Sequence, residues 1–97
     1  MHWQGSDHSW SRASILMNVP NTSGVYVIWN PDGCICVGET HDLQRRLLDH
    51  HDHPTPCMLE HGPPTAFGFD PCSIEQRTRK QSALTRALHP RCVDQAC

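Results

Sequence analysis

The stretch GVYVIWNPDGCICVG, residues 24–38, predicts two short strands joined by a tight turn. Residues 24–29 are rich in β-branched and aromatic side chains, which favour strands because they fit a pleated, half-buried surface. The NPDG sequence at residues 30–33 is typical of a turn, since proline presets φ and the Asp-Gly pair tolerates tight geometry. Residues 34–38 form the second strand. We therefore expect an antiparallel hairpin here.

Helical and strand patterns continue after the hairpin. Leucines at helical spacing within residues 42–51 predict an amphipathic helix. Alternating phenylalanines predict a third strand over residues 65–69, after a loop that begins at Pro54. A last helix is expected from the candidate N-cap Ser73 to His89. The order β-β-α-β-α predicts an α/β (α+β) fold in which helices flank a small three-stranded, mainly antiparallel sheet.

The length of 97 residues allows one domain. We expect a core over residues 21–92 and an N-terminal extension over residues 1–20, a short helix or turn that covers an edge. A second domain for targeting does not fit, so another protein or the shape of the substrate must direct the chain. The sequence has no signal-peptide pattern and no apolar run of membrane-spanning length, which predicts a cytoplasmic location and no membrane partner.

Six cysteines are many for a chain of this length. A secreted protein would use them as disulfides, but without a signal peptide we expect reduced thiols. Zinc is the alternative, because the loop region also holds several histidines. The Cys34-x-Cys36 spacing is tighter than the usual zinc knuckle, so a structural zinc ion is not expected. A mixed zinc site remains conceivable, with candidate ligands His50, His51, His53, Cys57 and His61.

The net charge of −2 hides an uneven distribution of cations. Five of the eight lysines and arginines lie between residues 77 and 91, and Arg45 and Arg46 form a second group. A local basic face on a near-neutral protein is one interpretation, and the solvated faces of two helices are the other. On the first interpretation, Arg45, Arg77 and Lys80 are the candidates for nucleic-acid binding.

The order and spacing of these motifs resemble the GIY-YIG nuclease superfamily. Gly24-Val25-Tyr26 stands where that family has Gly-Ile-Tyr, and Cys36-Val37-Gly38 stands where it has Tyr-Ile-Gly. The helix with Arg46 and His50 follows, and then an arginine-rich last helix that closes at His89-Pro90. The resemblance covers most of residues 20–92.

This resemblance implies a metal-assisted endonuclease that hydrolyses phosphodiesters, with DNA as the expected substrate and Mg²⁺ or Mn²⁺ as the cofactor. Arg46 would neutralise transition-state charge, since a guanidinium can hold two oxygens at once. Tyr26 would position or activate the attacking water, and His50, one helical turn beyond Arg46, would assist proton transfer. Gly24 and Gly38 would have structural roles, because glycine in a strand allows close backbone approach.

Two positions depart from the family pattern. Cys36 replaces the second tyrosine at a catalytic position, and a thiol cannot reproduce the reach of a phenol. Gln81 stands in place of the metal-binding glutamate, and a neutral carboxamide is a weaker ligand for a hard cation. We expect hydrolysis to be slower by about 10²–10⁴-fold, or about 3–5 kcal/mol of transition-state stabilisation.

The last helix supports a site at Gln81 without reference to the family. Gln81 lies on one stripe with Leu84 and Leu88, preceded by Ile74 and Arg77, and this stripe should face the sheet. A polar group there either marks a site or bonds to the backbone. Three functions stay open: an endonuclease impaired by Gln81, an inactive nuclease-fold module that binds nucleic acid or a protein, and a zinc-held interaction module.

Overall fold

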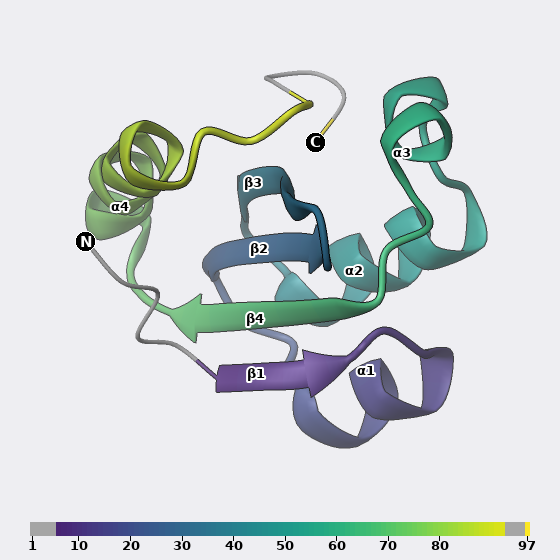
Figure 1. Ribbon diagram of the computed structural model, residues 1–97. Coiled ribbons are helices and arrows are strands. Elements are labelled where there is room, and N and C mark those ends of the chain that lie inside the picture. The colour runs from purple at the N-terminus through teal and green to yellow at the C-terminus, as the bar shows by residue number, and fades with distance from the viewer. Residues whose placement is uncertain (1–5, 93–96) are drawn as a thin grey trace.

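The structure, a computed structural model, describes residues 6–92 and residue 97. Figure 1 shows a sheet with helices on both sides, so the expected α+β class is confirmed. The elements in chain order are β1 (Ser6–Ser9), α1 (Arg12–Asn18), β2 (Gly24–Asn30), β3 (Gly33–Thr40), α2 (Leu43–Asp52), α3 (Pro56–His61), β4 (Ala66–Pro71) and α4 (Ile74–Leu88).

The sheet has four antiparallel strands in the order β1-β4-β2-β3, one more than expected. The hairpin of β2 and β3 is the expected one, and its register places Tyr26 opposite Gly38. The additional strand, β1, lies in the N-terminal extension and pairs with β4. Its sequence, SDHS, has no pattern typical of a strand. Backbone hydrogen bonds to β4 hold these residues in the sheet instead.

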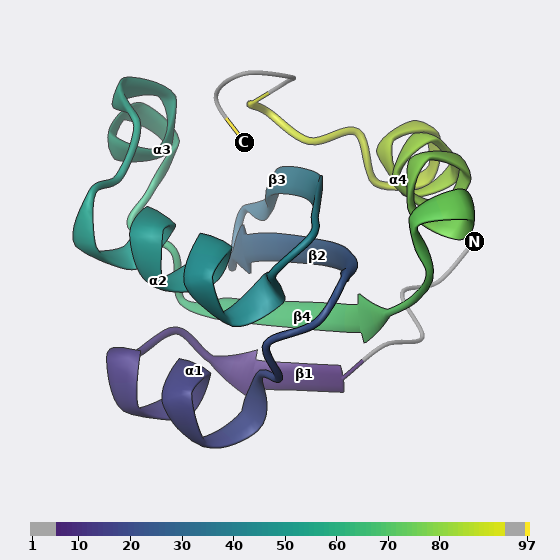
Figure 2. The same cartoon turned by 180° about the vertical axis from the view of Figure 1, so that it is seen from behind.

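Both faces of the sheet are covered, as Figures 1 and 2 show. Strand residues alternate between faces, so Tyr26 and Ile28 of β2 pack into the core under α1 and α2. Val25 and Val27 instead pack with Leu84 of α4 on the opposite face. A site that includes Tyr26 must therefore lie on the α2 side of the sheet.

Side-chain caps explain where the shorter helices begin. The Ser11 side chain accepts from the Ser14 N–H at the start of α1, which confirms a short helix in the N-terminal extension. Helix α3 was expected to be loop, and that expectation was wrong. Thr55 caps α3 by accepting from the Met58 N–H, and Pro56 at its first position suits a helix start.

Helix α4 follows the expected stripe only in part. Leu84 is buried, and Arg77 and Gln81 are half-buried, but Ile74 is 65% exposed. The stripe therefore meets the sheet from Arg77 onward and not from the first turn. Within residues 6–92 and 97, no helix is long and apolar enough to cross a membrane.

The chain after α4 turns back along the sheet. His89 adopts a left-handed conformation at the helix end, with φ of 49°. The Arg91 N–H then donates to the Cys34 carbonyl at 3.2 Å, and the Cys92 N–H donates to the Ile35 carbonyl at 2.8 Å. These two bonds attach the segment to β3, the edge strand of the sheet.

Candidate functional site

Tyr26 sits at the middle of β2 with its side chain fully buried. Its ring lies over Gly38, its cross-strand partner. A Cβ atom at Gly38 would be 2.3 Å from both Cζ and Oη of Tyr26. Gly24 is also close to its neighbours, because a Cβ there would be 2.6 Å from the Asp70 carbonyl oxygen. Both glycines thus permit close approach, and Gly38 fixes where the phenol points.

Helix α2 supplies two more polar groups from the same face. Its start is fixed by Asp42, whose side chain accepts from the Arg45 N–H, and buried Leu43 and Leu47 hold it against the sheet. This packing turns Arg46 and His50, one helical turn apart, toward the Tyr26 hydroxyl. His50 is 2% exposed, and its Nε2 lies 3.0 Å from the Tyr26 hydroxyl oxygen.

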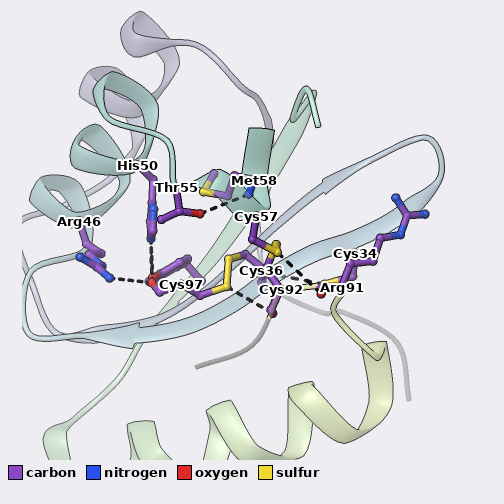
Figure 3. Close-up of a disulfide and its surroundings, with 11 residues drawn as sticks. Cys34, Cys36, Arg46, His50, Thr55, Cys57, Met58, Arg91, Cys92 and Cys97 are labelled. Carbon is purple, nitrogen blue, oxygen red and sulfur yellow. Dashed lines mark hydrogen bonds between the residues drawn. A yellow bond between two sulfur atoms is a disulfide. The ribbon is translucent and has the colours of Figure 1, made fainter. Parts of the chain in front are cut away.

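The three side chains converge on a single oxygen atom, the main-chain oxygen of Cys97. The Tyr26 hydroxyl donates to this oxygen, and the Arg46 Nη2 donates to it at 2.9 Å. The His50 Nε2 lies 2.7 Å from the same oxygen. Figure 3 shows Arg46 and His50 both pointing at Cys97. The three side chains thus direct their polar groups at one oxygen atom.

Burial sets the protonation of both titratable groups. It raises the pKa of Tyr26, against the lowering effect of Arg46, and the phenol stays neutral. It lowers the pKa of His50, so the imidazole is neutral near pH 7. A carbonyl oxygen only accepts, so Nε2 must carry its hydrogen to bond with Cys97.

A hollow of about 420 Å³ opens beside Arg46 and Cys97 on the side of α4. Gln81 faces it, and across the described part of the chain the Gln81 side chain has no hydrogen-bond partner. Arg77 also faces it, held by Glu39 at 3.4 Å and by the Ser23 hydroxyl at 3.2 Å. The lining residues are Val37, Gly38, Glu39, Thr40, His41, Arg46, Arg77, Gln81 and Cys97.

The other predicted nucleic-acid contacts lie outside this hollow. Arg45 is exposed and lines a neighbouring hollow of about 550 Å³ on the outer side of α2, which Arg46 also lines. Lys80 donates to Asp70 at 2.8 Å. The structure therefore brings Arg46 and Arg77 to one hollow and places Arg45 and Lys80 at other positions.

The expectation of reduced thiols is wrong for four of the six cysteines. Cys36 is bonded to Cys97, and Cys57 is bonded to Cys92. The thiols of Cys34 and Cys72 are free. The tertiary fold brings together partners 61 and 35 residues apart, which spacing alone does not reveal. Cys36 therefore offers no thiol in this state, and Cys57 offers no thiolate to zinc.

The donors in the hollow do not fit a resident divalent cation. Gln81 contributes a neutral amide oxygen, and the Glu39 carboxylate is already paired with Arg77. Hard cations favour several carboxylate oxygens. Among residues 6–92 and 97, no group of three His, Cys, Asp or Glu side chains is placed to hold a metal ion.

Sequence reasoning missed two parts of this site. It missed Glu39, although the position directly after Gly38 was a usable signal. It also missed the Cys97 oxygen, for which no signal exists, since any residue carries a main-chain oxygen. The disulfide to Cys36 brings Cys97 to the site, and the oxygen that it presents there belongs to the main chain.

No protein-family model and no curated protein matches the sequence. Solved structures do match. The GIY-YIG N-terminal endonuclease domain of UvrC from Thermotoga maritima, bound to magnesium as its catalytic divalent cation, is 20% identical with a TM-score of 0.65. The match covers 82% of this chain and 91% of that one. A point mutant of the same domain gives 20% identity and a TM-score of 0.67, over 86% and 94% of the two chains. This chain therefore has a GIY-YIG-like fold.

Proposed function

We propose that the chain is a GIY-YIG-type endonuclease that hydrolyses phosphodiesters of DNA. The observation that carries this proposal is the convergence of Tyr26, Arg46 and His50 on one oxygen atom. A charged guanidinium, a phenol and an imidazole that meet at one point suit an oxygen of a phosphate group. The nuclease activity of the structurally similar UvrC domain supports the same interpretation.

Each of the three side chains has a distinct part in the proposed reaction. Arg46 binds a non-bridging phosphate oxygen and offsets the charge that grows on it in the transition state. Tyr26 orients the attacking water. His50 accepts the proton of that water or of Tyr26, because its lowered pKa keeps the imidazole neutral near pH 7. This step requires Nε2 to be free of its hydrogen.

We propose that this site binds a divalent metal ion with low affinity. A divalent cation supplies Lewis-acid stabilisation of phosphate oxygens in nucleases of this kind. We propose that Gln81 weakens the affinity for Mg²⁺ or Mn²⁺ and slows hydrolysis by about 10²–10⁴-fold, as expected when a neutral ligand replaces a carboxylate. Glu39 is the carboxylate that remains in the hollow, and it is shared with Arg77.

The proposed partner is DNA, held at the site and along neighbouring basic residues. Arg77 faces the same hollow as Arg46, and Arg45 extends the cationic surface along α2. A targeting protein remains part of the proposal. A cytoplasmic location stays a prediction. Disulfides persist mainly in oxidising compartments, so the redox state of the isolated protein bears on it directly.

A second function is favoured by two specific observations. Gln81 is neutral, and Cys36 is tied up in a disulfide where the family has a phenol. A nuclease-fold module that binds nucleic acid or a protein without cutting would tolerate both changes. Its binding site would still use Arg46, so loss of Arg46 weakens binding under either function.

Cleavage assays separate the two functions. Plasmid and branched DNA are incubated with the parent chain, with Gln81→Glu and with Gln81→Glu/Arg46→Ala, in Mg²⁺ or Mn²⁺, with and without a dithiol reductant. We expect Gln81→Glu to cut about 10²–10⁴-fold faster than the parent, because the restored carboxylate binds the cation. The double variant, which lacks the phosphate-binding fork, is the control. If neither the parent nor Gln81→Glu cuts any DNA or RNA, the endonuclease proposal is overturned.

A further inference from the structure

We infer that the Cys36–Cys97 disulfide is a redox-controlled latch. In the oxidised chain it holds the main-chain oxygen of Cys97 in the site formed by Tyr26, Arg46 and His50, and its reduction frees that site for the phosphodiester. This inference deepens the proposed function and rests on it, because the latch is meaningful only where the three side chains bind a phosphate.

The latch fills the site with a competitor for the substrate. The Cys97 oxygen accepts from Arg46 at 2.9 Å and lies 2.7 Å from the His50 Nε2, and Tyr26 also donates to it. Two oxygens cannot share one position, so a phosphate oxygen is excluded while Cys97 stays. Figure 3 shows the disulfide to Cys36 on the other side of Cys97 from Arg46 and His50. All three functional groups are occupied at once.

The bound oxygen also stops His50 from acting as a base. At 2.7 Å from a carbonyl oxygen, Nε2 carries a hydrogen and has no lone pair to accept a proton. Nε2 therefore cannot accept a proton from a neighbouring water molecule or from the Tyr26 phenol. The latch therefore blocks both substrate binding and proton transfer.

The disulfide, and not the hydrogen bonds alone, keeps the competitor in place. Cys36 is fully buried on β3, and its bond to Cys97 fixes the Cys97 backbone beside Tyr26. Such a tether gives this main-chain oxygen a high effective concentration at the site. Once the disulfide is reduced, the Cys97 oxygen loses this advantage, and a phosphate oxygen, which forms charge-assisted bonds to Arg46, takes its place.

The second disulfide, between Cys57 and Cys92, holds the chain at a point before Cys97. Cys92 is bonded to Cys57, and the Cys92 N–H donates to the Ile35 carbonyl at 2.8 Å. Reduction of Cys36–Cys97 alone therefore releases Cys97 while the chain stays attached at Cys92. This makes the Cys57–Cys92 pair a matched control for the latch.

The opening reaction is an ordinary thiol–disulfide exchange with a dithiol reductant. One reductant thiolate attacks the Cys97 Sγ, and Cys36 leaves with the bonding electron pair and takes up a proton. The second reductant thiol closes a disulfide on the first and releases Cys97 as a thiol. Two electrons and two protons pass from the reductant to the cystine. Cys97 is 6% exposed and is among the residues that line the hollow beside Gln81, so we expect the attack from that side.

The nearby free thiol of Cys34 does not interfere with the latch. Burial raises the pKa of Cys34 to about 11, so the thiol stays protonated near neutral pH. Attack on a disulfide requires a thiolate. Exchange within the protein is therefore slow, and the latch responds to the external reductant.

The latch is tested first without nucleic acid. Tyr26 is the single tyrosine of the sequence, so tyrosinate absorbance near 295 nm during a pH titration reports on this site alone. We compare the oxidised chain, the dithiol-reduced chain, Cys97→Ala, and Cys57→Ala/Cys92→Ala. Opening should lower the Tyr26 pKa, because burial raises it in the latched state. Reduced chain and Cys97→Ala should shift together, and oxidised Cys57→Ala/Cys92→Ala should not shift.

The second readout uses a labelled 20-base-pair DNA duplex in the presence of Ca²⁺ or Mg²⁺. Reduction or Cys97→Ala should lower the dissociation constant by roughly 10–100-fold, as expected when an intramolecular competitor is untethered. Reduction should have no further effect on Cys97→Ala, but should still tighten binding by Cys57→Ala/Cys92→Ala.

The outcomes separate the latch from the proposed function. An unchanged Tyr26 titration, with equal DNA binding and cleavage before and after reduction, would overturn the latch. A Tyr26 shift on opening, with no DNA bound in any form, supports the latch and overturns the endonuclease. Circular dichroism checks that each variant is folded, and the reduced parent chain provides an opened site without any substitution.

Discussion

Replacing Gly38 with alanine should disturb the site through a single methyl group. The new Cβ would lie 2.3 Å from Cζ and Oη of Tyr26, and ordinary contacts between such atoms are about 3.5 Å. The ring must therefore move by about 1.2 Å. Tyr26 is fully buried, so the move forces neighbouring side chains to shift. Overpacking of this kind costs about 1–3 kcal/mol, and loss of the phenol hydrogen bonds adds about 1 kcal/mol.

We therefore expect Gly38→Ala to lower the free energy of unfolding by about 2–4 kcal/mol in urea denaturation. A displacement of 1 Å at a catalytic group can also reduce the rate about 10²-fold, which is measured most easily in the Gln81→Glu background. Tyr26→Leu provides the control, because a smaller side chain leaves room for the methyl group. In that background the same substitution should cost less than about 1 kcal/mol. Equal costs in the two backgrounds would refute the packing argument.

Three further predictions concern the charged and titratable groups. Arg46→Lys should weaken duplex binding by about tenfold in a fluorescence titration, because an ammonium lacks the two-pronged geometry of a guanidinium. Arg77→Ala should reduce the slope of log binding constant against log salt by about 1, whereas exposed Arg79→Ala, outside the hollow, should change it less. The pKa of His50 is lowered in the folded state, so His50 becomes protonated at a lower pH in the folded chain than in the unfolded chain. Stability should therefore be full above about pH 6.5 and fall below it, and His50→Gln should reduce this fall in urea titrations at several pH values.

The hairpin and its flanking helices were predictable because their signals are local. Residues 24–38 contain strand, turn and strand propensities in sequence, and each depends on near neighbours only. Helix α3 was missed because two prolines suggested a loop, although Thr55 and Pro56 form a good helix start. Strand β1 was missed because its four residues gain their conformation from β4, which is distant in the sequence.

The part of the candidate site that could be predicted is the part set by the spacing of residues within a single helix or strand. Arg46 and His50 lie one turn apart, so any helix over residues 42–51 places them on one face. The sequence also suggested Tyr26 as a site residue and Gln81 as the position of the family glutamate, and these roles stay predictions. It could not show that Glu39 pairs with Arg77, or that Lys80 pairs with Asp70, because those contacts join separate elements.

The sequence by itself determined the fold class, the central hairpin and the three side chains that converge in the site. Only the tertiary structure decided the state of the cysteines and therefore what occupies that site. Cys36 and Cys97 are 61 residues apart, and whether two such thiols meet depends on how the segment after α4 returns along β3. Disulfide geometry requires the two backbones to be close, here 5.7 Å between Cα atoms, and only the folded chain sets that distance.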